Sequence, residues 1–183
     1  MPFRAFIAVE VPFSAELERY SKAVKSSGAS VKMVDLRNTH ITLKFLGDTD
    51  ETLIPNIEDA MRSAISDISP FKMVLKGAGA FPDFKRISVV WAGLTDADSL
   101  GVIAKRIDEC LKPLGFAPER RPFSPHVTIA RVRDGRNIHE LADVIHGWEA
   151  SEFGEVPVES IILKKSVLTP QGPVYSDVSV VKL

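Results

Sequence analysis

The sequence predicts an α+β fold in which one structural unit occurs twice, with two antiparallel sheets flanking a central cleft and helices on the outside. Two observations predict it. The motif His-x-Thr, flanked by apolar residues, occurs at His40 and again at His126. A similar order of strand-like and helix-like segments also surrounds each copy. We expect residues 1–183 to form a single domain made of two pseudo-symmetric lobes.

The first half begins with residues 4–9, an apolar run that predicts a strand. Ser14 follows, and this residue type predicts the N-cap of a helix that extends to about residue 25. The remaining elements of this half are expected in the order motif strand, helix and strand, over residues 40–43, 51–67 and 71–75.

The second half repeats this order. Residues 86–91 predict its first strand, and apolar residues at i, i+3 and i+4 spacing from Leu100 to Leu111 predict a helix over 98–114. A motif strand, a helix and two further strands are then expected over residues 126–129, 138–145, 155–167 and 174–181.

The two motifs have a simple geometry on a strand. Because successive side chains point to opposite faces, His40 and Thr42 share one face while the apolar residues Ile41 and Leu43 take the other. The second motif repeats the arrangement, with His126 and Thr128 on one face and Val127 and Ile129 behind them. Each motif strand therefore presents an imidazole and a hydroxyl to a shared cleft.

This constellation suits displacement at phosphorus, which needs a base behind the attacking oxygen and an acid behind the leaving oxygen. Two histidines can supply one neutral and one charged imidazole near neutral pH. Threonine hydroxyls can donate hydrogen bonds to the non-bridging oxygens. We therefore expect His40 and His126 to be catalytic and Thr42 and Thr128 to bind the phosphate. The residues alone leave open which histidine is the acid.

Arg131 is a further candidate for phosphate binding. It lies five residues beyond His126, so a regular strand would place it on the opposite face, whereas a bulge would return it to the phosphate. Phosphate binding and a solvated surface charge both remain open. Lys44 and Arg121 are expected to be surface charges. The aromatic residues near the motifs are expected to pack in the core or in turns rather than stack on bases, namely Phe45, Phe81, Trp91 and Tyr175.

Composition limits the partners and the compartment. With 23 Lys and Arg against 24 Asp and Glu, the chain lacks the basic field that long nucleic acids require. Local arginines near the second motif favour a small phosphorylated ligand or a nucleic-acid end. The single cysteine, Cys110, excludes an internal disulfide, and no apolar run approaches the length of a membrane helix. We expect a cytoplasmic protein without a signal peptide.

Several segments of the chain resemble a known family. They are residues 4–12, 39–47, 79–82, 121–131 and 172–175, which read RAFIAVEVP, THITLKFLG, GAFP, RPFSPHVTIAR and GPVY. They are similar to the two-histidine phosphoesterases and, among these, to the RNA 2′,3′-cyclic phosphodiesterases, also called 2′-5′ RNA ligases. The resemblance covers nearly the whole chain and neither motif departs from the family pattern.

The resemblance implies a bilobal α+β fold with the two motifs across a central cleft. It implies hydrolysis of a 2′,3′-cyclic phosphate at an RNA 3′ end to a 2′-phosphate, together with reversible 2′-5′ joining of RNA ends. In the family's assignment His40 is the proton donor to the departing 3′ oxygen and His126 is the acceptor from water. The implied partners are RNA ends with a cyclic phosphate, tRNA fragments being one candidate.

No cofactor and no metal are expected. The chain has no Gly-Lys-Ser/Thr phosphate loop, and neither motif has metal-ligand spacing with companion carboxylates. We expect no membrane association, no obligate protein partner and a monomer. Two other functions stay open: a two-histidine phosphoesterase for a small cyclic or 2′-5′ nucleotide, and a non-catalytic RNA-end-binding protein. Substrate profiling separates the first, while intact histidines in both motifs argue against the second.

Overall fold

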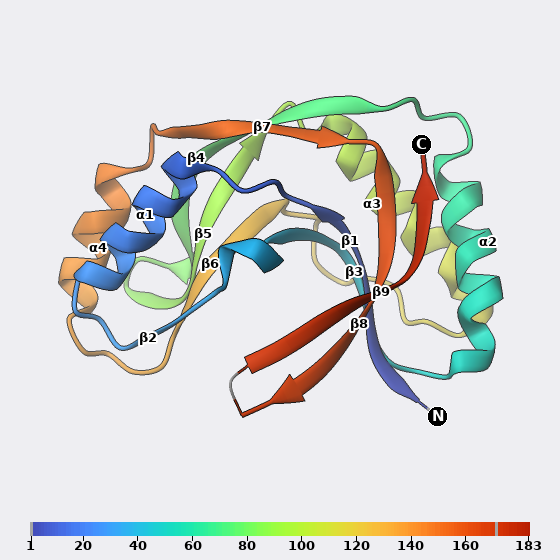
Figure 1. Ribbon diagram of the computed structural model, residues 1–183, viewed down its shortest axis with the longest axis horizontal. Helices are drawn as coiled ribbons and strands as arrows, with labels where there is room; N and C mark the ends of the chain where they lie inside the picture. Colours follow the sequence, from blue (N-terminus) through green and yellow to red (C-terminus); the bar gives the residue numbers. More distant parts are fainter. Residues whose placement is uncertain (1, 171) are drawn as a thin grey trace.

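The computed structural model describes residues 2–170 and 172–183, and these form an α+β fold with two antiparallel sheets (Figure 1). The strands of the first sheet lie in the order β3 (His40–Thr49), β1 (Phe3–Glu10), β8 (Ser160–Thr169) and β9 (Gly172–Lys182). Those of the second lie in the order β2 (Val31–Met33), β6 (His126–Val132), β5 (Arg86–Thr95), β4 (Phe71–Asp83) and β7 (Glu152–Val158). The predicted fold class is confirmed.

The helices lie outside the sheets in two pairs. Helix α1 (Ala15–Ser26) packs against α4 (Ile138–Gly147) and β7, and α2 (Ile54–Ile65) packs against α3 (Asp98–Leu111). Figure 1 shows the first pair at one end of the molecule, beside the five-stranded sheet, and the second pair at the other end. In the described part of the chain, none of the helices combines the length and apolar character needed to cross a lipid bilayer.

Helix signals in the sequence are confirmed with small shifts. The Ser14 hydroxyl accepts a hydrogen bond from the Leu17 backbone N–H at 3.2 Å, so Ser14 caps α1 as predicted. The predicted helix over 98–114 is α-helical to Leu111 and continues as a 3₁₀ turn that contains Pro113, which cannot donate to an α-helical ladder. The apolar face of α3 is buried, with Leu100, Ile103, Ala104, Ile107 and Leu111 all shielded from solvent.

Each sheet combines strands from both halves of the chain. A motif strand pairs with the opening strand of its own half, β3 with β1 and β6 with β5. The strands that follow in each sheet come from the other half of the chain. Strands β8 and β9 of the second half extend the first sheet, and β4 of the first half extends the second. The orders β3-β1-β8-β9 and β6-β5-β4-β7 therefore correspond position by position. Because of this exchange, the two halves form one folded unit that contains both motif strands.

One strand prediction was wrong. The single strand expected over 155–167 is two strands, since β7 ends at Val158 in the second sheet and β8 begins at Ser160 in the first. The chain crosses between the sheets at Glu159, whose carbonyl accepts a hydrogen bond from the Leu183 N–H at 3.0 Å. Both strands are apolar and extended, so the pattern does not mark the crossing. Strand β2 was not expected either, and β4 continues to Asp83, well beyond the predicted end.

A close contact in the second sheet yields a stability prediction. The ring of Trp91 lies against Gly79, so a Cβ built on Gly79 would be 2.2 Å from the Trp91 ring. We expect Gly79→Ala to lower the free energy of unfolding by about 1–3 kcal/mol, as overpacking does, in urea denaturation. Gly147→Ala is the matched control, because its Cβ would have open space. Equal stability of the two variants would contradict the contact.

Candidate active site

The two motif strands begin at their histidines and lie against each other, β3 at the edge of one sheet and β6 in the other. The side of these strands that carries His40, Thr42, His126 and Thr128 is called here the motif face. His126 and Arg131 lie close enough to His40 for their charges to influence its pKa. The structure thus brings together the two predicted histidines and the predicted arginine.

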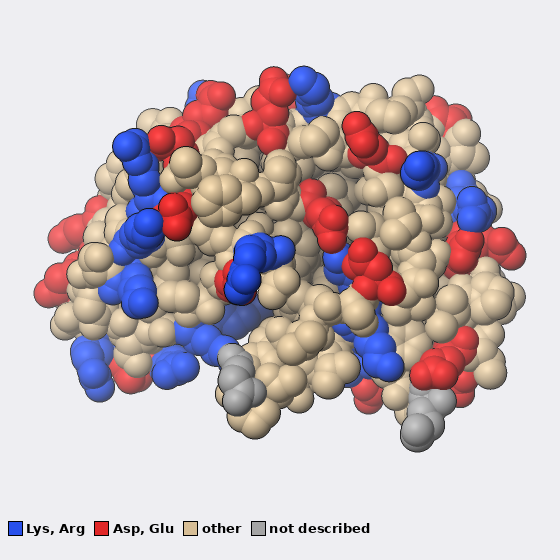
Figure 2. Space-filling model, in the orientation of Figure 1, with Lys and Arg blue, Asp and Glu red and all other residues tan. Residues whose placement is uncertain are grey.

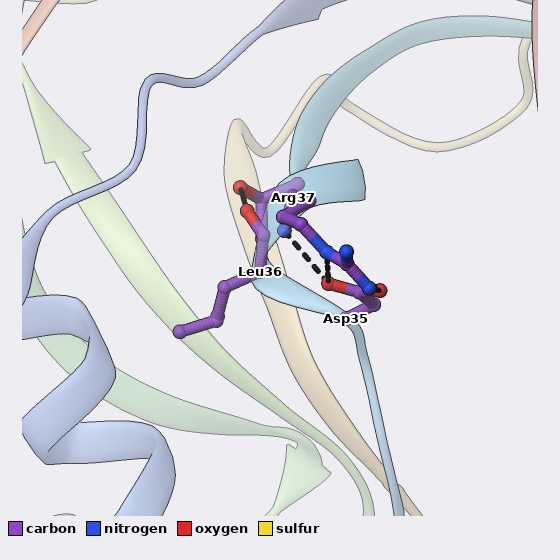
Figure 3. Close-up of polar contacts among 4 residues, drawn as sticks. Asp35, Leu36 and Arg37 are labelled. Carbon is purple, nitrogen blue, oxygen red and sulfur yellow. Dashed lines mark hydrogen bonds and ion pairs between the residues drawn. The ribbon is translucent and has the colours of Figure 1, made fainter.

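A short 3₁₀ turn (Leu36–Asn38) holds the chain just before the first motif (Figure 3). The Asp35 carboxylate accepts hydrogen bonds from the backbone N–H of Arg37 at 3.0 Å and from its guanidinium at 2.7 Å. The Asn38 N–H donates to the Asp35 carbonyl at 2.9 Å, and the Thr39 hydroxyl donates to the Leu36 carbonyl at 2.8 Å. The turn therefore fixes the position of the Asn38 carbonyl.

Both histidines are oriented in the same way. The Nδ1 atom of His40 lies 2.9 Å from the Asn38 carbonyl oxygen, and Nδ1 of His126 lies 2.8 Å from the Ser124 carbonyl oxygen. A carbonyl oxygen only accepts hydrogen bonds, so Nδ1 carries the proton in each ring. Nε2 is then the atom that accepts a proton when the ring is neutral and donates one when it is charged.

A β-bulge places Arg131 on the motif face. Thr128 pairs with Trp91 and Ala130 pairs with Val90, so Ile129 is an extra residue in β6. Ile129 and Ala130 are both fully buried, and the next side chain, Arg131, is exposed. Of the two positions that the sequence left open for Arg131, the structure has the one beside the histidines.

The first motif strand contains the same bulge. Thr42 pairs with Ala8 and Lys44 with Ile7, which makes Leu43 the extra residue. Leu43 and Lys44 are both buried, and the following residue returns to the motif face. That residue is Phe45. We expected its ring to pack in the core or in a turn, but it is 66% exposed.

Aromatic rings restrict both imidazoles. The Phe6 ring lies 4.9 Å from that of His40, and Tyr175 meets His40 edge-on at 5.2 Å. Phe81 meets His126 edge-on at 4.9 Å and is itself 5.3 Å from Trp91. Phe81 and Tyr175 were expected to pack in turns or the core. In the structure they pack on the two histidines.

A cavity of about 750 Å³ lies beside His40, lined among others by Glu10, Arg37, Lys164, Tyr175 and Asp177. Lys164 is 7% exposed and donates hydrogen bonds to Glu10 at 2.7 Å and to Asp177 at 2.6 Å. Sequence reasoning missed this ion network. The only signal for it was the pairing of β1 with β3, which sets Glu10 directly opposite His40.

The surroundings of His40 favour its neutral form. Burial lowers the pKa of His40, and the charges of Lys164, His126 and Arg131 lower it further, while the hydrogen bond to Asn38 opposes the shift. Burial also raises the pKa of Tyr175, which the charge of Arg131 partly opposes. A bound anion would offset the cations and restore the affinity of His40 for a proton.

Lys44 was expected to be a surface charge and is instead 2% exposed. Its Nζ donates to the Asp108 carboxylate at 2.6 Å and to the Ala117 carbonyl at 2.9 Å. The same carboxylate oxygen accepts from the Glu119 N–H at 3.0 Å. Lys44 thereby ties the first motif strand and α3 to the segment that leads to His126. Arg121 is exposed, as expected.

Comparison with known proteins identifies the family. Residues 10–165 match the model of the 2′-5′ RNA ligase superfamily. The chain belongs to this superfamily. It is 37% identical to a Methanothermobacter thermautotrophicus protein named RNA 2′,3′-cyclic phosphodiesterase, over 100% of both chains. A Methanocaldococcus jannaschii protein of the same name is 39% identical, over 94% of this chain and 96% of that one.

Solved structures agree with this membership of the 2′-5′ RNA ligase superfamily. The Thermus thermophilus protein TT0787 superposes with a TM-score of 0.76 and 27% identity, over 98% of this chain and 97% of that one. E. coli LigT complexed with 3′-AMP superposes with a TM-score of 0.70 over 100% of this chain and 99% of that one. At 21% identity this second likeness is one of fold alone.

The buried lysine of this 2′-5′ RNA ligase superfamily member gives a second prediction. Lys44→Met leaves the Asp108 carboxylate without its cation, and we expect it to lower the free energy of unfolding by about 3 kcal/mol. This is the low end for a broken buried pair, because Asp108 keeps some contact with water. Lys72→Met, which breaks the exposed pair with Glu155, is the control and should change urea stability far less. Similar losses in both variants would contradict the anchoring role.

The charges around His40 give a third prediction. Arg131→Gln removes a cation that disfavours the protonated imidazole, so the pKa of His40 should rise. An NMR titration of the His40 ring signals measures it in the unliganded protein. Arg133→Gln serves as the control, because Arg133 is not among the charges that act on His40. An unchanged pKa in Arg131→Gln would show that this guanidinium lies too far from the ring to matter.

Proposed function

We propose that the protein hydrolyses RNA 2′,3′-cyclic phosphate ends to 2′-phosphate ends by metal-independent acid–base catalysis between His40 and His126. The relatives named RNA 2′,3′-cyclic phosphodiesterase match along the whole chain. The observation that carries the mechanism is the shared orientation of the two imidazoles, each with Nδ1 bonded to a carbonyl two residues upstream. This leaves Nε2 of both rings available for proton transfer.

The proposed reaction is a single displacement. Nε2 of neutral His126 takes a proton from water as the water oxygen bonds to phosphorus. The bond from phosphorus to the 3′ oxygen breaks, and that oxygen takes the proton from Nε2 of charged His40. The product has a 2′-phosphate and a 3′ hydroxyl, and the two histidines have exchanged roles. A 5′ hydroxyl in place of water would form a 2′-5′ bond without any nucleotide cofactor.

The phosphate ligands are proposed from their place on the motif face. Thr42 and Thr128 lie two residues after their histidines, half-buried, where their hydroxyls can donate to non-bridging oxygens. The Arg131 guanidinium supplies positive charge beside His40. A phosphodiester anion bound there would counter the cations that lower the pKa of His40, so binding of substrate would charge the proton donor.

We further propose that residues 1–183 work as one domain whose two pseudo-symmetric lobes each contribute one histidine. The protein would act in the cytoplasm as a monomer on RNA ends such as those of tRNA fragments.

Removal of either histidine tests the mechanism. His40→Ala and His126→Ala should each lower kcat by about 10²–10⁴-fold, the range for loss of a general acid or base. The substrate is a short RNA with a 2′,3′-cyclic phosphate, in EDTA, with the product terminus mapped. His139→Ala, in α4, is the matched control and should keep the wild-type rate. Near wild-type rates in a motif variant would refute the mechanism, provided that urea unfolding shows the folds to be equal.

A sulfur substitution tests the order of acid and base. In a cyclic phosphate whose 3′ oxygen is replaced by sulfur, the leaving group needs no proton. The loss of activity in His40→Ala should then be much smaller, whereas His126→Ala should stay impaired. The reverse result would assign the donor role to His126. If the protein cleaved 2′-5′ dinucleotides and not the RNA, its substrate would instead be a small nucleotide, as in the alternative function given above.

A further inference from the structure

Two like charges lie opposite each other on neighbouring strands of the second sheet, beside the motif face. In the pairing of β2 with β6, Lys32 stands directly opposite Arg131. Their neighbours Val31 and Val132 pack against the core, so both charged side chains point the other way. Like charges directly opposite each other in a sheet are destabilising. Such a pair suggests an anion between the side chains as its missing partner.

The positive charge continues along β6. Arg133 lies two residues past Arg131 with the core residue Val132 between them, so it shares the same face. Its N–H donates to the Ser30 carbonyl at 2.8 Å, which extends the sheet pairing beyond the end of β6. We call the row of Lys32, Arg131, Arg133, Lys85 and Arg86 the basic lane. In residues 2–170 and 172–183, none of these five side chains forms an ion pair.

The basic lane ends in a cavity of about 290 Å³. Lys85, Arg86 and Arg133 line it together with Asp134 and Ile138, the first residue of α4. Asp134 accepts from the Arg136 N–H at 2.9 Å and also binds Ser30, so its carboxylate is already engaged. Three cations against one carboxylate leave the cavity positive, and its lining contains no aromatic ring. It suits a phosphate better than a base.

Figure 2 shows the same distribution on the surface, although the net charge of the chain is only −1. Lys and Arg side chains gather along the lower left of that view, over the region of β2, and reach the hollow beside the β8–β9 hairpin. From His126 to Arg133, one residue beyond β6, the chain covers roughly 23 Å at the usual strand rise per residue. That length spans several nucleotides.

We propose that the basic lane binds the backbone phosphates of the RNA strand that leads to the terminal cyclic phosphate. This rests on the proposed function and narrows its substrate class to oligonucleotides. The lane begins at Arg131 and ends in the cavity, so a strand whose end is at the histidines would meet these cations beyond its terminal phosphate. A mononucleotide is too short to reach past Arg131.

Two substrates separate this proposal from the proposed function. One is a 2′,3′-cyclic mononucleotide and the other a short RNA that ends in the same nucleotide with a cyclic phosphate. In Arg86→Gln/Arg133→Gln, which removes two cations from the far cavity, KM for the RNA should rise about tenfold or more while kcat/KM for the mononucleotide stays unchanged. The slope of log(1/KM) against log salt should also fall by about 0.7 for each phosphate that the variant no longer neutralises. Lys85→Gln, in the lining of the same cavity, should act in the same direction.

The control is Lys105→Gln/Lys182→Gln, which removes the same charge from exposed positions outside the lane. A general effect of net charge would change KM for the RNA equally in both double variants and overturn the proposal. So would an unchanged KM and salt slope in Arg86→Gln/Arg133→Gln. Fluorescence anisotropy of a labelled RNA gives the affinity without turnover. Absence of turnover of both the RNA and the mononucleotide in the wild type would instead refute the proposed function.

Discussion

The extra residue in each motif strand determines which side chains face one another across the site. In β3 the first of two bulges falls at Leu43, and in β6 the bulge falls at Ile129, one position after the threonine in both cases. Without it, the strand alternation would turn the fifth residue after each histidine into the core. With it, one strand presents Phe45 and the other Arg131 on the face that carries the imidazoles. The same type of bulge thus places an aromatic ring on the motif face in β3 and a cation on it in β6.

The backbone geometry around the two histidines is therefore similar, but the charges around them differ. Both imidazoles are fixed by a carbonyl oxygen and by an aromatic ring, so their available nitrogens are set by the backbone. The charges are not symmetric, because Lys164 and its two carboxylates lie on the His40 side only. Near-identical geometry with different electrostatics is how two equal groups can take opposite roles in proton transfer.

The parts of the site that follow from local periodicity could be predicted from the sequence. Alternation alone places His40 and Thr42 on one face and Ile41 in the core, and the five buried residues of α3 follow from helical spacing. The burial of Lys44 and the exposure of Phe45 could not be predicted, because both depend on a bulge that exists only when β3 pairs with β1. The crossing at Glu159 could not be predicted for a similar reason. The two strands that it joins, β7 and β8, differ in the strands they pair with and not in their composition.

The exchange of strands has a consequence for how the chain acquires its site. The first half supplies β4 to the sheet of the second, and the second half returns β8 and β9 to the sheet of the first. A ribosome-bound chain that ends near Arg86 therefore has β1 and β3 with no β8 to cover the open edge of β1. His40 reaches its final surroundings only after the C-terminal hairpin has been synthesised, because Tyr175 and Lys164 of that hairpin lie near its ring, so completion of the site is a late event that depends on long-range pairings.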